Sequence, residues 1–326
     1  MKSRLIHIAH QADAWLAKKS LRLKAEKPVL LILLFHELFL NQQELSQDRM
    51  FPHEWLTLDH FRQFVRYFLK ANYRFVSPDD ISNGLDPQKH HILISFDDGY
   101  YNNHRALKVL HEFEVPAVFS IATDYVLNPR AYWWDVHYRE EKKAGKSFQS
   151  ILSAQQMLKK MDYEQVEMYL KEAYGARAFE AMSDTDRPFS SDELRDFARE
   201  KYVHIGNHTR HHAILPHYEK DEMRKEIAGA QRDLRKICGF APKFIAYPNG
   251  EASPLVVQQA REQGLEIGVI ASLGKQNLPL TKAQYLQLDR YQIYGVRDIP
   301  QQCEMLRAEI SLKVLYRGLR NATKTN

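Results

Sequence analysis

Two groups of residues in this chain could carry chemistry: the adjacent acids Asp97 and Asp98, and two histidines four positions apart, His208 and His212. The acids follow an apolar run at 92–96, which predicts a buried strand that delivers them to the mouth of a sheet or barrel. Neighbouring residues of an extended strand point opposite ways, so we expect the two acids to have different roles. Histidines four positions apart share one face of a helical turn, where they could bind one cation.

Two histidines and one carboxylate make a metal triad that leaves positions open for water and substrate. The second carboxylate is then free to act as a base. This ligand set favours zinc, with cobalt or nickel as alternatives. The spacing therefore predicts a metal site with a base beside it.

At these residues the sequence resembles the polysaccharide deacetylases of the NodB type, which are metal-dependent carbohydrate esterases. Phe-Asp-Asp-Gly at 96–99 matches the Asp-Asp motif of that family, and His-Thr-x-x-His at 208–212 matches its His-Ser/Thr-x-x-His motif. The resemblance runs over residues 29–294 and implies that Asp97 is the general base. It also implies a set of metal ligands, namely Asp98, His208 and His212.

One departure from the family pattern concerns the group that orients the base. The family has an Arg-x-Pro-x-Gly-like motif where this chain has Ala-Tyr-Pro-Asn-Gly at 246–250, so Ala246 stands in the place of the arginine. Arg290, near the end of the last expected strand, is our candidate for the missing arginine. A surface salt bridge is the alternative role for Arg290.

A second departure concerns the general acid. No histidine follows His217, so the carboxy-terminal Leu-x-His of the family is absent. His36 ends the first expected strand, where many relatives have a Tyr-His pair, and it is our candidate for the acid. Proton shuttling by Asp97 is the alternative, and a purely structural role for His36 is equally open.

Four residues are predicted to contact the substrate: Tyr100, Trp134, Tyr247 and Pro248. Trp134 belongs to an aromatic cluster that could stack on sugar rings, or could instead pin its segment to the core. A backbone N–H near Tyr100 is expected to help bind the oxyanion of the reaction.

Strand and helix patterns alternate along the chain, and every suspect residue falls at the carboxyl end of a strand. This arrangement predicts an α/β fold, a distorted or incomplete TIM-like (β/α) barrel of the polysaccharide deacetylase type. A charged, helical stretch interrupts the alternation and is expected to form loops or a lid on the functional face. We expect a basic amphipathic helix at 1–27, the barrel at 28–300 with its insert at 128–188, and a C-terminal segment at 301–326 whose helix, expected at 303–319, packs on the barrel.

Composition describes an ordinary globular protein of 326 residues, with 44% hydrophobic and 27% charged residues. Two cysteines, Cys238 and Cys303, cannot build a disulfide framework, which favours the cytoplasm. The net charge of +5 resides in residues 1–27, because the remaining 39 basic and 39 acidic residues cancel. A nucleic-acid enzyme would carry a basic stripe through its main domain, so we expect no nucleic-acid partner.

The amino-terminal helix has an apolar stripe at helical spacing, made by Leu5, Ile8, Ala12 and Trp15. Peripheral attachment to an anionic membrane surface or a partner is one interpretation, and packing against the outside of the barrel is the other. The apolar run at 29–35 is far shorter than the roughly 20 residues of a membrane span, and no signal-peptide cleavage site follows it. We therefore expect a cytoplasmic protein, with membrane association at most peripheral.

The resemblance implies hydrolysis of an acetamide on a sugar, which yields a free amine and acetate, as in bacterial glycan biosynthesis. The substrate would be an acetylated glycan of the N-acetylhexosamine type. Deacylation of another acylated or lipid-linked glycan is one alternative. A carbohydrate-binding homologue that has lost turnover is another, favoured by the missing arginine and histidine and opposed by the intact acids and histidines.

Overall fold

A computed structural model describes residues 2–23 and 25–309 of the chain, with side chains from residue 11 onward. Ten strands form one sheet: β1 (Val29–Phe35), β2 (Arg74–Phe75), β3 (His91–Phe96), β4 (Ala117–Ile121), β5 (Val203–Asn207), β6 (Phe244–Ala246), β7 (Ile267–Ile270), β8 (Gln276–Asn277), β9 (Leu288–Asp289) and β10 (Tyr291–Gln292). The main order is β10-β1-β3-β4-β5-β6-β7-β9, and all neighbours in it run parallel. The short strands β2 and β8 pair with β3 and β1 outside this order.

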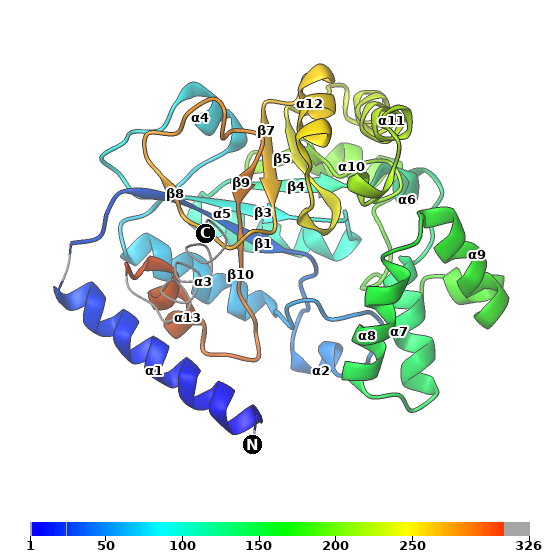
Figure 1. The fold of residues 1–326 in the computed structure, drawn as a ribbon, viewed down its shortest axis with the longest axis horizontal. Helices are drawn as coiled ribbons and strands as arrows, with labels where there is room; N and C mark the ends of the chain where they lie inside the picture. Colours follow the sequence, from blue (N-terminus) through cyan, green and yellow to red (C-terminus); the bar gives the residue numbers. More distant parts are fainter. Residues whose placement is uncertain (1, 24, 310–326) are drawn as a thin grey trace, which may run out of the picture.

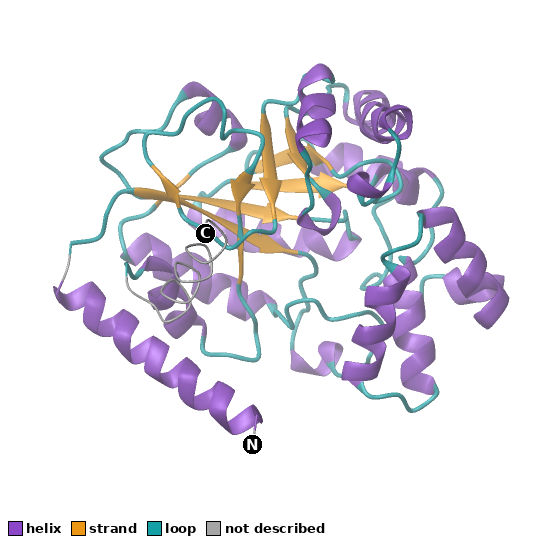
Figure 2. Ribbon diagram, viewed as in Figure 1, coloured by secondary structure: helices purple, strands orange, loops and turns teal. Residues whose placement is uncertain are grey.

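The two ends of this sheet meet in one short segment of chain. β9 pairs with β7 and β10 pairs with β1, and only Arg290 separates β9 from β10. The segment 288–292 therefore bridges the sheet into a nearly closed barrel, which Figure 2 shows with its strands in orange. The predicted distorted, TIM-like α/β barrel is confirmed.

Helices surround the barrel and extend to one side of it (Figure 1). They are α1 (Lys2–Leu23), α2 (Gln42–Leu45), α3 (Leu58–Lys70), α4 (Pro78–Asn83), α5 (Leu107–Phe113), α6 (Thr123–Leu127), α7 (Trp133–Lys143), α8 (Phe148–Leu158), α9 (Tyr163–Tyr174), α10 (Ser191–Phe197), α11 (Lys220–Cys238), α12 (Pro254–Glu262) and α13 (Ile299–Arg307), with 3-10 turns η1 (Tyr101–Ala106), η2 (Ala176–Phe179), η3 (Leu215–His217) and η4 (Pro248–Gly250). The stretch at 128–188, expected as a helical insert, holds α7, α8 and α9, which lie together on the right of Figure 1. The division of the chain into domains stays a prediction.

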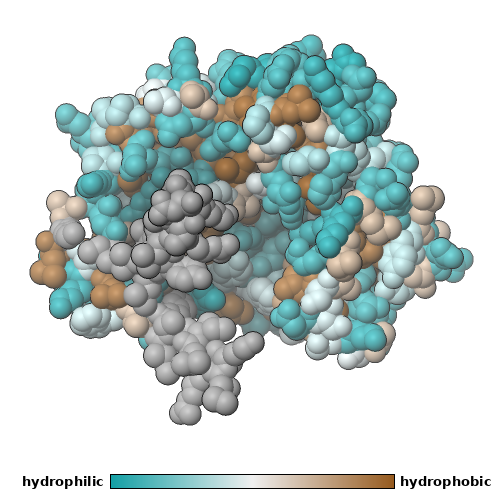
Figure 3. All heavy atoms as spheres, viewed as in Figure 1, coloured by the Kyte–Doolittle hydropathy of each residue, from teal (hydrophilic) through white to brown (hydrophobic). Residues whose placement is uncertain are grey.

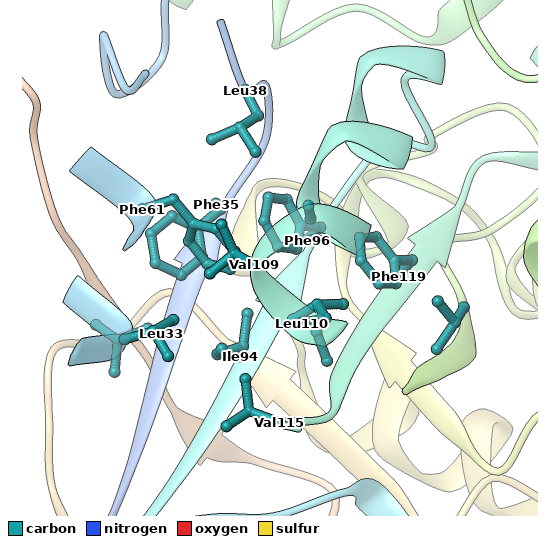
Figure 4. Close-up of a cluster of buried hydrophobic side chains, with 14 of the residues drawn as sticks. Leu33, Phe35, Leu38, Phe61, Ile94, Phe96, Val109, Leu110, Val115 and Phe119 are labelled. Carbon is teal, nitrogen blue, oxygen red and sulfur yellow. The ribbon is translucent and has the colours of Figure 1, made fainter. Parts of the chain in front are cut away.

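The alternating positions of β1 pack into two different cores. Leu31, Leu33 and Phe35 face the outer layer of helices, whereas Leu30 and Ile32 belong to a second cluster with residues of β6 and β7. All seven residues of β1 are buried, as expected for a parallel strand covered on both faces. Figure 4 shows α5 lying over the outward side chains of β1, β3 and β4.

Local sequence signals set most helix boundaries. Ser190 and Glu193 have the three-residue spacing of a capping box, and α10 begins there. Ser190 accepts a hydrogen bond from the Glu193 amide, and the Glu193 side chain accepts one from the Ser190 amide. The final helix was expected at 303–319, and this boundary is wrong at its start. The helix begins at Ile299, because Asp298 caps it by accepting from the Gln301 amide, and it ends at Arg307. Residues 310–319 lie outside the described part of the chain.

The surface in view is mostly hydrophilic, with hydrophobic residues in small groups (Figure 3). Among the described helices, none combines the length and the apolar character that crossing a bilayer requires. Both cysteines are free thiols, and Cys303 is buried.

The outer core should dominate stability, and Phe96 lies at its centre. Its ring is fully buried and contacts those of Phe35 and Phe119 at centroid distances of 5.2 and 4.9 Å. We expect Phe96→Ala to lower the free energy of unfolding by about 3–5 kcal/mol because it leaves a cavity. Denaturant unfolding measures this loss, and Phe240→Ala, at a 43% exposed site, is the matched control. Equal losses in both variants would contradict the assignment of the core.

Candidate active site

The predicted acids and histidines meet in one cavity of about 240 Å³ at the carboxyl ends of the strands. β3 supplies Asp97 and Asp98 just beyond its last residue, and β5 supplies the loop that carries His208 and His212. The wall also includes residues from elsewhere, namely His36, His53, Trp134, Lys159, Arg290 and Gln292. Parallel strands with a common direction bring these distant segments together, as in other barrels of this type.

Asp97 is held by the segment that closes the barrel. The Nη1 atom of Arg290 donates a hydrogen bond to Oδ1 of Asp97 at 2.9 Å, and the hydroxyl of Ser95 lies 3.2 Å from the same nitrogen. Both Asp97 and Arg290 are 2% exposed, so the description of Arg290 as a surface salt bridge does not apply. Burial alone would raise the pKa of Asp97, but the charges of Arg290 and His208 outweigh it and hold that pKa below its usual value.

Asp98 turns its carboxylate into the same cavity through an unusual backbone. Its φ is +74°, in the left-handed region that aspartate tolerates better than most residues. The alternation of an extended strand thus stops at Phe96, and Asp97 and Asp98 share one site. Both Asp98 oxygens are buried without a hydrogen-bond partner in the described chain. Burial alone would raise the pKa of Asp98, but the nearby imidazoles of His208, His36 and His212 outweigh it and lower that pKa.

The two histidines converge from a loop, so the expected helical turn is wrong. Thr209 and His212 both have positive φ, at 62° and 56°, and the side chain of Asn207 accepts from the Thr209 amide at 2.7 Å. The Thr209 hydroxyl in turn accepts from the amide of Ala213 at 2.9 Å. These hydrogen bonds engage backbone amides that would otherwise bond within a helix. They fold the loop back, so that the ring centroids of His208 and His212 lie 4.8 Å apart.

Three residues form a group that could hold a metal ion, with ligand atoms all within 4.8 Å of one another: Asp98, His208 and His212. The Nε2 atoms of His208 and His212 lie 3.3 and 3.4 Å from Oδ1 of Asp98. Nδ1 of His208 lies 2.7 Å from the carbonyl of Ala246, which fixes the ring and leaves Nε2 for a ligand. Burial and His208 lower the pKa of His212 to about 3, so its ring is neutral, as metal binding requires. The bare carboxylate of Asp98, the neutral ring of His212 and the available Nε2 of His208 fit a divalent cation.

His36 lines the same cavity and has partners that sequence reasoning missed. Its Nδ1 is 2.7 Å from Oε1 of the fully buried Glu54, and its ring stacks on that of His53 at 4.2 Å. His53 is itself 3.1 Å from the buried Glu37. Burial lowers the pKa of His36, but the charge and hydrogen bond of Glu54 outweigh it and raise that pKa to about 10. A second group of possible metal ligands arises here, from His36, His53 and Asp98, but the near-parallel stacking of the two rings suits one shared ion poorly.

The four predicted substrate contacts are distributed differently. Trp134 lines the cavity, but it is only 4% exposed, and its Nε1 donates to the hydroxyl of Tyr100 at 2.7 Å. Tyr100 is fully buried and donates to Asp135 at 2.8 Å. Among the described residues that line the cavity, Tyr100, Tyr247 and Pro248 do not occur, whereas Asn249 and Gly250 of the same turn do.

A family model, described as polysaccharide deacetylase, matches residues 84–268, which is more than half of the chain. The chain belongs to the polysaccharide deacetylase family. The match contains the Asp-Asp and His-x-x-x-His motifs and the turn at 246–250, so the resemblance drawn from the sequence is confirmed.

A curated relative of this deacetylase-family chain is a peptidoglycan-N-acetylglucosamine deacetylase from Bacillus cereus, 38% identical over 74 residues. The match covers 23% of this chain and 26% of that protein. A Streptococcus pyogenes deacetylase solved in complex with acetate covers 86% of this chain and 99% of its own, at 16% identity and a TM-score of 0.58. A polysaccharide deacetylase from Bacillus cereus covers 86% of this chain and 69% of its own, at 16% identity and a TM-score of 0.56. At such identity the solved structures establish the shared fold.

We expect the purified protein to bind about one divalent ion per chain. His212→Ala should abolish that binding because it removes one of three clustered ligands, and His217→Ala, at an exposed position of the same segment, should leave it unchanged. Elemental analysis after dialysis against zinc measures both. Absence of zinc, cobalt and nickel uptake by the unmodified protein would rule out the metal site.

Proposed function

We propose that this protein is a metal-dependent hydrolase that removes N-acetyl groups from a polysaccharide or oligosaccharide. The observation that carries the proposal is the single cavity in which Asp97, fixed by Arg290, lies beside the group of Asp98, His208 and His212. Membership of the polysaccharide deacetylase family supports the same reaction.

Asp98, His208 and His212 would hold the ion, with zinc as the cation that best matches one carboxylate and two imidazoles. When bound, such an ion polarises the acyl carbonyl and acidifies a water molecule. Asp97 then takes the proton of the attacking water, and its lowered pKa keeps it in the anionic form that a base requires. Arg290 acts through Asp97, because its guanidinium fixes the carboxylate and leaves Oδ2 for the proton.

His36 is the proposed proton donor to the departing amine. The bond to Glu54 occupies Nδ1 and keeps the ring protonated near neutral pH, so Nε2 carries a proton on the cavity side. The backbone amides on either side of Tyr100 already donate within the chain, Gly99 to the carbonyl of Asp97 and Tyr101 to that of Arg187, so the expected oxyanion donor near Tyr100 is not part of the proposal. In this proposal Asp97 accepts the proton of the attacking water and His36 supplies the proton of the departing amine. Together these two transfers account for water attack and amine release.

The proposed partner is an acetylated glycan of the N-acetylhexosamine type, the class named for the curated relative from Bacillus cereus. Trp134, Asn249 and Gln292 line the cavity and are the proposed contacts for the sugar. Release of a longer acyl chain, or of an O-acetyl group, would place the protein among deacylases of other glycans. Binding without turnover would make it a carbohydrate-binding homologue.

The first functional test separates the two acids. Asp97→Asn should retain the metal and lose roughly 10²- to 10⁴-fold in rate, because the proton of the water then has no acceptor. Asp98→Asn should instead weaken metal binding and recover part of its activity in excess zinc. Acetate release from an N-acetylglucosamine oligomer measures the rate. Full activity of Asp97→Asn, or equal metal loss in both variants, would contradict the assigned roles.

The second test asks whether His36 donates a proton, by comparing substrates with two different leaving groups. An amine must be protonated as it leaves, whereas 4-nitrophenolate leaves without a proton. His36→Ala should therefore lose roughly 10²-fold or more on the acetylated oligomer and much less on 4-nitrophenyl acetate. His53→Ala, which removes the stacked neighbour, is the matched control and should lose less on the oligomer. Equal losses on both substrates would assign His36 a structural role.

A further inference from the structure

We infer that α1 is an interfacial helix that binds the protein to an anionic lipid surface through its outward face. This face consists of Trp15, Lys18, Lys19, Arg22 and Leu23. The inference concerns a surface remote in sequence from the catalytic residues and does not depend on the proposed reaction.

The described part of α1 packs on the protein through small and polar residues, together with the half-buried Leu16 and Leu21. Its buried residues are Asp13, Ala14, Ala17 and Ser20, which are small or polar, and this face lies against α13. Figure 1 shows α1 along the outside of the molecule with α13 beside it. The described part of α1 thus packs on α13, and this contact does not use the apolar stripe that the sequence displays.

That apolar stripe points to solvent. Ala12 is exposed, and Trp15 and Leu23 are 61% and 73% exposed. Trp15 and Leu23 are thus exposed on the same side of the helix. Exposed large apolar side chains of this kind mark an interaction site, because a helix that only covers a core turns such residues inward.

The exposed charge on this segment has one sign. Lys18, Lys19 and Arg22 are exposed, whereas the two acids of residues 1–27 are turned away from the surface. Asp13 is 3% exposed, and Glu26 pairs with Arg307 at 2.7 Å. Three basic residues of the described part of α1, namely Lys18, Lys19 and Arg22, are therefore exposed on the face that also carries Trp15.

This combination favours a lipid surface over a protein partner. Tryptophan sits well at the level of lipid headgroups, and lysine and arginine beside it reach anionic phosphates while their stems cover apolar atoms. Lys19 already extends over the ring of Trp15, with Nζ 4.9 Å from its centroid. A protein interface would need a wider apolar core, whereas two apolar side chains with three cations suit reversible binding to headgroups.

Flotation of the full-length protein with vesicles tests the inference. We expect it to float with vesicles of phosphatidylglycerol and phosphatidylcholine, to stay down with phosphatidylcholine alone, and to be released by high salt. Lys19→Glu combined with Arg22→Glu should weaken binding by at least about tenfold, since each cation near an anionic surface contributes several-fold. Trp15→Ser should also weaken it several-fold, because it removes the apolar anchor.

Two matched controls carry the same changes elsewhere. Arg199→Glu with Lys201→Glu reverses two exposed charges near α10, and Met168→Ser removes a 63% exposed apolar side chain from α9. Both should float as the unmodified protein does. Failure of the unmodified protein to float, or equal losses in the α1 variants and the controls, would overturn the inference. Weaker self-association of the α1 variants in sedimentation velocity, with flotation unchanged, would overturn it in favour of a protein interface.

Discussion

The buried ion pair of Arg290 and Asp97 is the interaction on which the site depends. Removing two charges from water costs several kcal/mol per ion. Such a pair is therefore stable only where its geometry is good and its remaining polar atoms also form hydrogen bonds. Here the pair lies where the barrel closes. Arg290 is the single residue between β9 and β10, and these strands pair with β7 and β1, the two ends of the remaining sheet. The guanidinium that orders the base therefore also ties the last strands to the end of β3. Chemistry and closure of the fold are coupled at this one contact.

Three of the eight described non-glycine residues with positive φ belong to the proposed metal group or its loop. Asp98, Thr209 and His212 all have positive φ, which costs non-glycine residues about 1 kcal/mol or more each. The surrounding bonds compensate for this cost, with Asn207 and the Thr209 hydroxyl holding the loop and Glu226 accepting from the amides of the two residues before His212. The proposed ligands are thus preformed but strained, and a cation bound there would satisfy the two carboxylate oxygens of Asp98 that lack partners.

Much of this arrangement could be predicted from the sequence, because it depends on local patterns. The apolar runs gave the strand at Val29–Phe35, and the ends of parallel strands must meet at one edge, so the acids and histidines had to converge. The His-x-x-x-His spacing was read as a helical turn, and a loop with two left-handed residues produces the same convergence. Side-chain partners were harder to predict: burial of Trp134 was one of the two roles expected for its aromatic cluster, but its hydrogen bond to Tyr100 has no signal in the sequence.

The partners of His36 were missed for a related reason. Glu37 directly follows it, and His53 and Glu54 lie 17 and 18 residues further on, in a loop without hydrophobic periodicity, so no pattern connects them to the first strand. A β-bridge between Thr57 and Phe39 holds that loop against the chain after the first strand. Only this path brings the carboxylate of Glu54 to the ring of His36 and that of Glu37 to the ring of His53. Adjacent His-Glu pairs at 36–37 and 53–54 were the available signal, and their meaning depends on long-range packing.

The helical insert contributes to the site as a wall more than as a free lid. Lys159, at the end of α8, donates to the side chain of Asn249 at 2.9 Å, and the ring of Tyr163 lies parallel to that of His211 at 4.0 Å. These two contacts attach the insert to the turn after β6 and to the loop between the proposed metal ligands. Opening the insert would therefore expose the stacked ring of His211 and disturb the loop that holds His208 and His212. Because those ligands must stay fixed for a cation to bind, a rigid insert serves the site better than a swinging one, and Trp134 lies buried between the two parts.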